Sequence, residues 1–271
     1  MKSHTIKGGG GTQLHAVETG NAKGAPILFI HGISQSSLTW IRQLESELAR
    51  NYRLVAMDLR GHGLSEKPRE GYSDSRLWAD DVRAVIKELK LDHPVLCGWS
   101  YGPLVILDYL RHYGEDDIRA INFVGGVTKL GSEEAVSVLT TDFLELVPGL
   151  FSSDADESAL SLASLIRLCF TEKLSAPDWY RMLGYNLSVP AYVRKGMFSR
   201  AFDKDDLLPR LGKPALITHG IDDKVVKSTV IDQQMSHIGS VKVRMMATGH
   251  GCFWDDAAGY NRSLAEFVAS L

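Results

Sequence analysis

Ser100 stands at the centre of a Gly-Trp-Ser-Tyr-Gly pentapeptide at 98–102, between a short apolar run and a stretch with helical periodicity. Glycines two positions to either side let neighbouring backbone approach, because a Cβ there would clash. A serine on such a sharp strand-to-helix turn presents its hydroxyl at the end of a sheet. The amide groups of the helix that starts there favour developing negative charge. The pattern predicts a nucleophile for acyl transfer; the alternative is a buried serine in a tight turn.

A serine hydroxyl is a weak nucleophile near neutral pH and needs an adjacent base. Four of the nine histidines lie at predicted strand ends or in the loops that follow them: His31, His62, His219 and His250. His250 is the best candidate for the base, because it follows the last predicted strand and its flanking glycines suit an exposed, mobile loop. For the other three histidines we expect structural hydrogen bonds.

An imidazole base also needs a carboxylate that holds one tautomer and stabilises the charged ring. The loop after the preceding predicted strand supplies two, Asp222 and Asp223, and the residue types alone leave the choice between them open. Two solvated loop aspartates are the alternative interpretation. The chain order serine, aspartate, histidine is the one expected for a doubly wound sheet with a hydrolytic site.

The oxyanion formed in acyl transfer needs hydrogen-bond donors, each worth roughly 10²–10³ in rate. The backbone N–H of Tyr101 is one candidate donor, since this residue directly follows Ser100. The second candidate is the backbone N–H of Ile33, in the loop after the apolar run at 27–30, where Gly32 lets the chain turn tightly.

Short, continuously apolar runs position these residues, and each run stops at a glycine or a polar loop. The runs span 27–30, 53–57, 94–97, 118–124, 215–218 and 241–246. Continuous rather than alternating apolar strands indicate a sheet covered on both faces. Helical periodicity over 38–50 and 76–91 lies between strands. The sequence predicts an α/β fold with a doubly wound, mostly parallel sheet, whose site lies at the carboxyl ends of the strands.

This alternation stops between about 128 and 206, where we expect no strand. Helical segments are expected to start near four positions: Ser132, Asp156, Pro177 and Pro190. We expect residues 128–206 to form a helical cap, or lid, inserted between two strands. Residues 1–127 and 207–271 then form a single core domain.

The composition is that of an ordinary globular chain, with 271 residues, 44% hydrophobic and 23% charged. Thirty Lys and Arg against 33 Asp and Glu leave a formal charge of −3, which is too balanced to indicate a nucleic-acid or anionic-membrane partner. We recognise no secretory signal and no apolar run near the ~20 residues that span a bilayer. Three cysteines at irregular spacing argue against disulfides and zinc. We therefore expect a cytoplasmic protein with a small-molecule substrate, and the sequence leaves homo-oligomerisation open.

The chain resembles the α/β-hydrolase fold superfamily over nearly its whole length. The matching segments are His-Gly at 31–32, Asp-Leu-Arg-Gly-His-Gly-Leu-Ser at 58–65, the pentapeptide at 98–102, His-Gly-Ile-Asp-Asp at 219–223 and Gly-His at 249–250. Within the superfamily, the segment 249–256 is similar to that of small esterases, lactonases and cofactor-free, non-haem haloperoxidases. Pro103 departs from the glycine that many relatives carry, although proline is accepted at a helix start. The serine nucleophile disfavours the related dehalogenases and epoxide hydrolases, which use aspartate.

The resemblance implies Asp223 as the acid, because the family's acid usually stands three residues after the glycine of the His-Gly pair. It also implies Ile33 and Tyr101 as the oxyanion donors. With Ser100 and His250, these residues predict a serine hydrolase of a small ester, lactone or related acyl substrate that needs no metal or organic cofactor. The alternatives are a C–C bond hydrolase of the same fold, a cofactor-free haloperoxidase or perhydrolase side activity, and a slow-turnover ligand receptor.

Aromatic side chains are the candidates for the wall of the substrate pocket. Trp99 and Phe253 flank the predicted catalytic positions, while Phe143 and Trp179 lie in the predicted cap. For the two cap residues core packing is at least as good an interpretation, because aromatic side chains routinely fill helical cores.

Overall fold

A mixed sheet forms the centre of the computed structural model, which describes residues 1–200, 202–203, 206–236 and 238–271. Within these residues the sheet has eight strands in the order β1-β2-β4-β3-β5-β6-β9-β10. Their bounds are β1 Lys2–Lys7, β2 Gln13–Gly20, β3 Pro26–Ile30, β4 Arg53–Met57, β5 Val95–Trp99, β6 Ala120–Val124, β9 Ala215–Gly220 and β10 Val241–Met246. The six strands from β4 to β10 in this order pair in parallel. The strand β2 is antiparallel to both of its neighbours, β1 and β4. The predicted doubly wound, mostly parallel sheet is confirmed.

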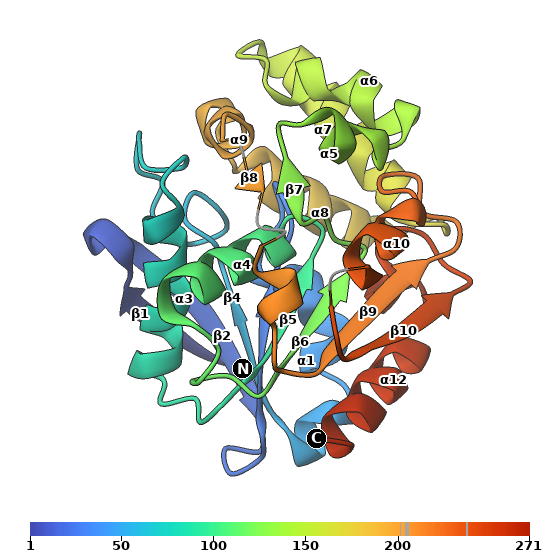
Figure 1. The fold of residues 1–271 in the computed structure, drawn as a ribbon. Coiled ribbons are helices and arrows are strands. Elements are labelled where there is room, and N and C mark those ends of the chain that lie inside the picture. The colour runs from blue at the N-terminus through green and yellow to red at the C-terminus, as the bar shows by residue number, and fades with distance from the viewer. Residues whose placement is uncertain (201, 204–205, 237) are drawn as a thin grey trace.

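Two groups of helices cover the sheet, which explains the continuously apolar central strands (Figure 1). Helix α3 (Ser75–Glu88) packs on α4 (Gly102–Tyr113), and α1 (Ile41–Leu44) packs with α11 (Cys252–Asp255) and α12 (Ala257–Ala269). All residues of β3, β5 and β6 are buried. Burying apolar surface stabilises the fold by about 25 cal/mol per Å². These buried strands therefore support the loops at their ends.

The chain between β6 and β9 lies over the carboxyl ends of the strands (Figure 1). It holds five α-helices within its described residues: α5 Glu133–Ser137, α6 Thr141–Leu150, α7 Ala155–Cys169, α8 Ala176–Leu187 and α9 Ala191–Phe198. The Oγ of Ser132 accepts the backbone N–H of Ala135 at 3.1 Å, so Ser132 caps α5 as predicted. Helix α6 was not predicted, although Thr140 caps it by accepting the backbone N–H of Phe143 at 3.2 Å.

Short strands at the two ends of this segment correct the expectation that 128–206 holds none. The strand β7 (Lys129–Leu130) pairs antiparallel with β8 (Phe202–Asp203) and ties the ends of the insertion together. Two residues are too short for any periodicity to show in a sequence. The division into a core and a cap stays a prediction.

Three further elements differ from the sequence-based expectations. The antiparallel strands β1 and β2 were not foreseen, because polar and half-exposed residues interrupt their apolar pattern. The helix expected over 38–50 is three short pieces, namely the 3₁₀ turn η2 (Ser37–Trp40), α1 and α2 (Leu48–Asn51). The strand β10 lies at the sheet edge with most of its residues exposed, so it is not covered on both faces.

The remaining short elements are η1 (Gly9–Gly11), η3 (Leu208–Arg210) and α10 (Thr229–Met235). Of the helices in the described ranges, none is both long and apolar enough to cross a bilayer.

Candidate active site

Ser100 occupies a strained turn between β5 and α4. Its φ is +58°, a left-handed conformation that costs a non-glycine residue of order 1 kcal/mol or more. Two backbone hydrogen bonds hold it there: Ser100 N–H donates to the Val124 carbonyl at 3.0 Å, and Val127 N–H donates to the Ser100 carbonyl at 3.2 Å. A Cβ at Gly102 would lie 2.6 Å from the Ile30 carbonyl oxygen, so the turn requires glycine at this position. Turn and helix start match the geometry expected from the pentapeptide.

His250 and Asp223 form a buried hydrogen-bonded pair at the ends of neighbouring strands. The ring Nδ1 of His250 lies 2.8 Å from Oδ2 of Asp223, and each side chain is 1% exposed. Oδ1 of Asp223 accepts the backbone N–H groups of Val225 and Val226 at 2.8 and 2.9 Å. These bonds fix the carboxylate, so it accepts a proton-bearing Nδ1 and leaves Nε2 of the ring available as a base. Asp222 is exposed.

The backbone around His250 is held from two sides. The indole N–H of Trp99 donates to the His250 carbonyl at 2.9 Å, and the two ring centroids are 5.3 Å apart. On the other side, Gly251 N–H donates to the carbonyl of Cys169, at the end of α7, at 2.7 Å. A Cβ at Gly125 would lie 3.1 Å from Nδ1 of His250, which leaves little room for a side chain. His250 is therefore buried and its backbone is hydrogen-bonded, in contrast to the exposed loop that its glycines suggested.

Three other histidines make structural hydrogen bonds, as their positions in the sequence predict. His62 donates from Nδ1 to the Arg60 carbonyl at 2.9 Å, and its Nε2 accepts Ser34 N–H at 3.2 Å. Burial, with a smaller effect of the neighbouring His31 ring, lowers the pKa of His62 to about 3, so the ring stays neutral. His31 accepts Leu59 N–H at 3.0 Å, and burial lowers its pKa as well.

His219 donates from Nε2 to the Val226 carbonyl at 3.1 Å, and burial lowers its pKa. Arg60, from the 58–65 motif, makes a bidentate ion pair with Asp81 at 2.7 and 2.8 Å. Both of these side chains are buried, which suits a supporting role for that loop.

The turn at 32–35 lies against Ser100. A Cβ at Gly32 would be 2.8 Å from the Cβ of Ser100, and Gln35 N–H closes the turn onto the Gly32 carbonyl at 3.4 Å. Ser34 has φ +60°, and its N–H bond to His62 fixes this conformation. Among the residues that the structure describes, no acceptor receives the N–H of Ile33 or of Tyr101. Two backbone donors beside Ser100 therefore remain available to a ligand.

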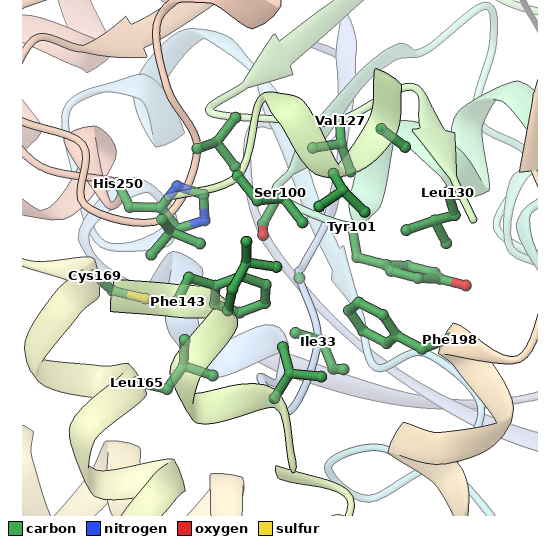
Figure 2. A pocket seen from close by; sticks show the side chains of 18 of the residues that line it. Ile33, Ser100, Tyr101, Val127, Leu130, Phe143, Leu165, Cys169, Phe198 and His250 are labelled. Carbon is green, nitrogen blue, oxygen red and sulfur yellow. The ribbon is translucent and has the colours of Figure 1, made fainter. Parts of the chain in front are cut away.

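A cavity of about 260 Å³ opens beside Ser100 and His250. Figure 2 shows the Ser100 hydroxyl and the His250 ring facing apolar side chains, most of which come from the chain between β6 and β9. The wall includes Val127, Leu130, Phe143, Phe151, Leu165, Cys169 and Phe198. Trp99 and Phe143, two of the candidate pocket residues, also line this cavity, and the wall suits an apolar acyl or alkyl group.

Two predicted pocket residues lie elsewhere. Phe253 is fully buried in the core, with its ring centroid 4.2 Å from that of Trp40 and 5.0 Å from that of Trp99. Trp179 lies in a separate surface depression, under the guanidinium of Arg167 at 4.7 Å. Sequence distance from a catalytic position does not tell whether an aromatic ring faces a cavity or the core.

Gln35 and Cys169 also line the cavity but were not predicted to do so. Gln35 lies in the same loop as Ile33, but its residue type gave no indication that the side chain faces a cavity, and Cys169 stands in no motif with chemical spacing. Across the described ranges of the chain, no group of three or more His, Cys, Asp or Glu side chains is arranged to hold a metal ion.

The chain is similar in sequence and in fold to known hydrolases and haloperoxidases. A model of the alpha/beta hydrolase family matches residues 27–262. The solved structure of the esterase RhEst1 from Rhodococcus sp. ECU1013 shares 34% identity over 100% of both chains, with a TM-score of 0.93. A non-heme haloperoxidase of Rhodococcus erythropolis is 27% identical over 96% of this chain and 97% of its own. The bifunctional esterase/perhydrolase DCH of Acinetobacter calcoaceticus is 27% identical over 91% of this chain and 92% of its own.

Proposed function

This chain belongs to the alpha/beta hydrolase family, and we propose that it cleaves small esters or lactones through an acyl-enzyme formed on Ser100. The observation that carries the proposal is the pairing of His250 with Asp223 at 2.8 Å beside the same cavity that Ser100 lines. A strained serine and a fixed imidazole at one apolar cavity are the parts that nucleophilic acyl transfer requires.

In the proposed reaction, Oγ of Ser100 attacks the substrate carbonyl while Nε2 of His250 takes its proton. Asp223 holds Nδ1–H and stabilises the imidazolium. The N–H groups of Ile33 and Tyr101 donate to the oxyanion, each worth roughly 10²–10³ in rate. The leaving alcohol departs with the proton from His250. A water molecule, activated by the same ring, then hydrolyses the acyl-enzyme and regenerates Ser100.

The cavity wall supports a neutral, largely apolar substrate. Lys129 in this wall lies 2.6 Å from the carboxylate of Glu134, which offsets its positive charge. A similar esterase over the full length of both chains adds support for ester cleavage.

Perhydrolysis is a second candidate, favoured by the relatives described as a haloperoxidase and as an esterase/perhydrolase. In this reaction hydrogen peroxide takes the place of water and attacks the acyl-enzyme. The product is a peracid. His250 accepts the proton of the attacking peroxide and returns a proton to the Ser100 oxygen as the acyl group leaves. Peracid formed from an ester and peroxide would reveal this activity, and its absence would exclude it.

Hydrolysis of p-nitrophenyl butyrate and of γ-butyrolactone by the native protein, Ser100→Ala and Ser228→Ala tests the main proposal. Ser228 is an exposed serine and provides a matched control. We expect turnover in the native and control proteins and its loss in Ser100→Ala. A fluorophosphonate should add its mass to Ser100 alone. Full activity in Ser100→Ala would overturn the mechanism, and saturable binding without turnover would favour the receptor alternative.

A further inference from the structure

Gln35 is a polar side chain that lines the cavity and that the proposed mechanism leaves without a role. The residue is 2% exposed, and it follows Ile33 by two positions in the turn against Ser100. A buried carboxamide has two donors and one acceptor oxygen to satisfy. Leaving such a group unpaired costs free energy, so its partners determine what the cavity accepts.

A chain of hydroxyl groups fixes the orientation of this amide. The hydroxyl of Thr39, on η2, lies 3.2 Å from Oε1 of Gln35 and 3.1 Å from the hydroxyl of Tyr185, on α8. The Thr39 hydroxyl has a single proton, and it donates to Oε1 of Gln35. The O–H of Tyr185 can serve as the donor in the second contact, so both hydrogen bonds can form together. This arrangement directs the Nε2 end of the amide away from Thr39.

The Nε2 group has no acceptor among the residues that the structure describes. Other polar groups of the wall are engaged: the Tyr101 hydroxyl donates to the Met197 carbonyl at 3.0 Å, and Lys129 is paired with Glu134. Outside the proposed catalytic groups, Nε2 of Gln35 is thus a side-chain donor of this wall that no described residue engages.

We propose that Nε2 of Gln35 donates a hydrogen bond to a second oxygen of the acyl group, close to the scissile carbonyl. The substrate class is then a small acyl ester or lactone with an ether or keto oxygen within a few bonds of the carbonyl, because the turn that carries Gln35 abuts Ser100. This specificity role rests on the proposed function. A purely apolar acyl group leaves the amide unpaired and is the poorer substrate.

A pair of esters that differ by one atom tests this role. p-Nitrophenyl methoxyacetate carries an ether oxygen where p-nitrophenyl butyrate carries a CH₂ group. The readout is the ratio of their kcat/KM values, divided by the ratio of their rates with hydroxide to remove intrinsic reactivity. We expect Gln35→Leu to lower this corrected ratio about three- to tenfold, the range for one lost hydrogen bond.

Gln13→Leu, at an exposed glutamine, is the matched control and should leave the ratio unchanged. Thr39→Val, which removes the bond to Oε1, should lower the ratio by a smaller factor. An unchanged ratio in Gln35→Leu, or an equal loss for both esters, would overturn the proposal. An increased ratio would show that Oε1 rather than Nε2 faces the substrate, which also contradicts it.

Binding to the Ser100→Ala protein separates this proposal from the proposed function. Methyl methoxyacetate should bind more tightly than methyl butyrate, and the additional Gln35→Leu change should remove the difference. This result requires no turnover, so it decides the role of Gln35 even if Ser100 proves not to be the nucleophile. Equal affinities for the two esters with Gln35 in place would refute the role.

Discussion

One oxygen of Asp255 joins the loop of His250 to the end of helix α7 through Thr171. Oδ2 of Asp255 accepts the backbone N–H of Thr171 at 3.1 Å, its hydroxyl at 2.9 Å, and the N–H of Gly249 at 2.9 Å. The residue before His250 and the chain leaving α7 therefore share a single carboxylate. Because α7 also forms part of the cavity wall, this contact couples the wall to the proposed base.

Replacing Asp255 by alanine should loosen both segments. Three donors lose a charged acceptor, and we expect the free energy of unfolding to fall by about 1–3 kcal/mol. Activity on p-nitrophenyl butyrate should fall about tenfold because His250 is less well positioned. Hydrogen exchange should increase at 169–171 and 249–251. Thr171→Val removes one of the three bonds and serves as the graded control; equal effects of the two variants would argue against the coupling.

The choice between the adjacent aspartates can be tested by matched amide substitutions. Asp223→Asn removes the carboxylate that lies 2.8 Å from the His250 ring and should lower kcat by about 10³–10⁴, because the ring loses its tautomer and its counter-charge. Asp222→Asn changes an exposed side chain and should leave kcat within about twofold. Steady-state kinetics measure kcat for both variants. A large loss of kcat in Asp222→Asn would contradict the assignment of Asp223 as the acid.

Gly32→Ala should disrupt the proposed oxyanion donors while leaving the fold intact. The new Cβ would meet the Cβ of Ser100 at 2.8 Å and the Trp99 carbonyl oxygen at 3.3 Å, so the turn must move away from the nucleophile. We expect kcat to fall at least about a hundredfold, the effect of losing one donor. Gly184→Ala, which meets no atom within 4 Å, is the control. Native-like activity in Gly32→Ala would contradict the role of this turn.

The residues at strand ends could be predicted because parallel topology brings those ends together. Ser100, Asp223 and His250 each follow an apolar run, so their positions can be recognised in a single sequence. The structure adds that His250 and Asp223 share a hydrogen bond, whereas the catalytic roles stay proposals. The choice of Asp223 over Asp222 rested on resemblance alone.

Packing partners could not be predicted in the same way, since residue type does not determine the direction of a side chain. Phe253 packs in the core three positions from His250, while Phe143 reaches the cavity from a remote helix. Gln35 shows the same difficulty for polar groups, because its importance depends on Thr39 and Tyr185, which lie on separate elements. These contacts are set by tertiary structure that no local pattern encodes.

The neutral state of His62 predicts a loss of stability in acid. The pKa of the ring is about 3 in the folded protein, against 6.5 as the ordinary value, chiefly because the ring is buried. Between these values the unfolded chain binds a proton at this position and the folded chain does not. The free energy of unfolding should therefore decrease as the pH falls below 6.5, by about 1.4 kcal/mol per pH unit, with no contribution above that pH.

Urea unfolding of the native protein and His62→Gln at pH 7, 6 and 5 measures this contribution. The variant should be less stable at pH 7, because Ser34 N–H and the Arg60 carbonyl lose well-placed partners. Between pH 6 and 5 the free energy of unfolding should decrease less for the variant than for the native protein. The difference between the two decreases should be about 1.4 kcal/mol. His93→Asn, at an exposed ring, should follow the native curve. Parallel curves for native protein and His62→Gln would show that His62 is not the group that titrates only on unfolding.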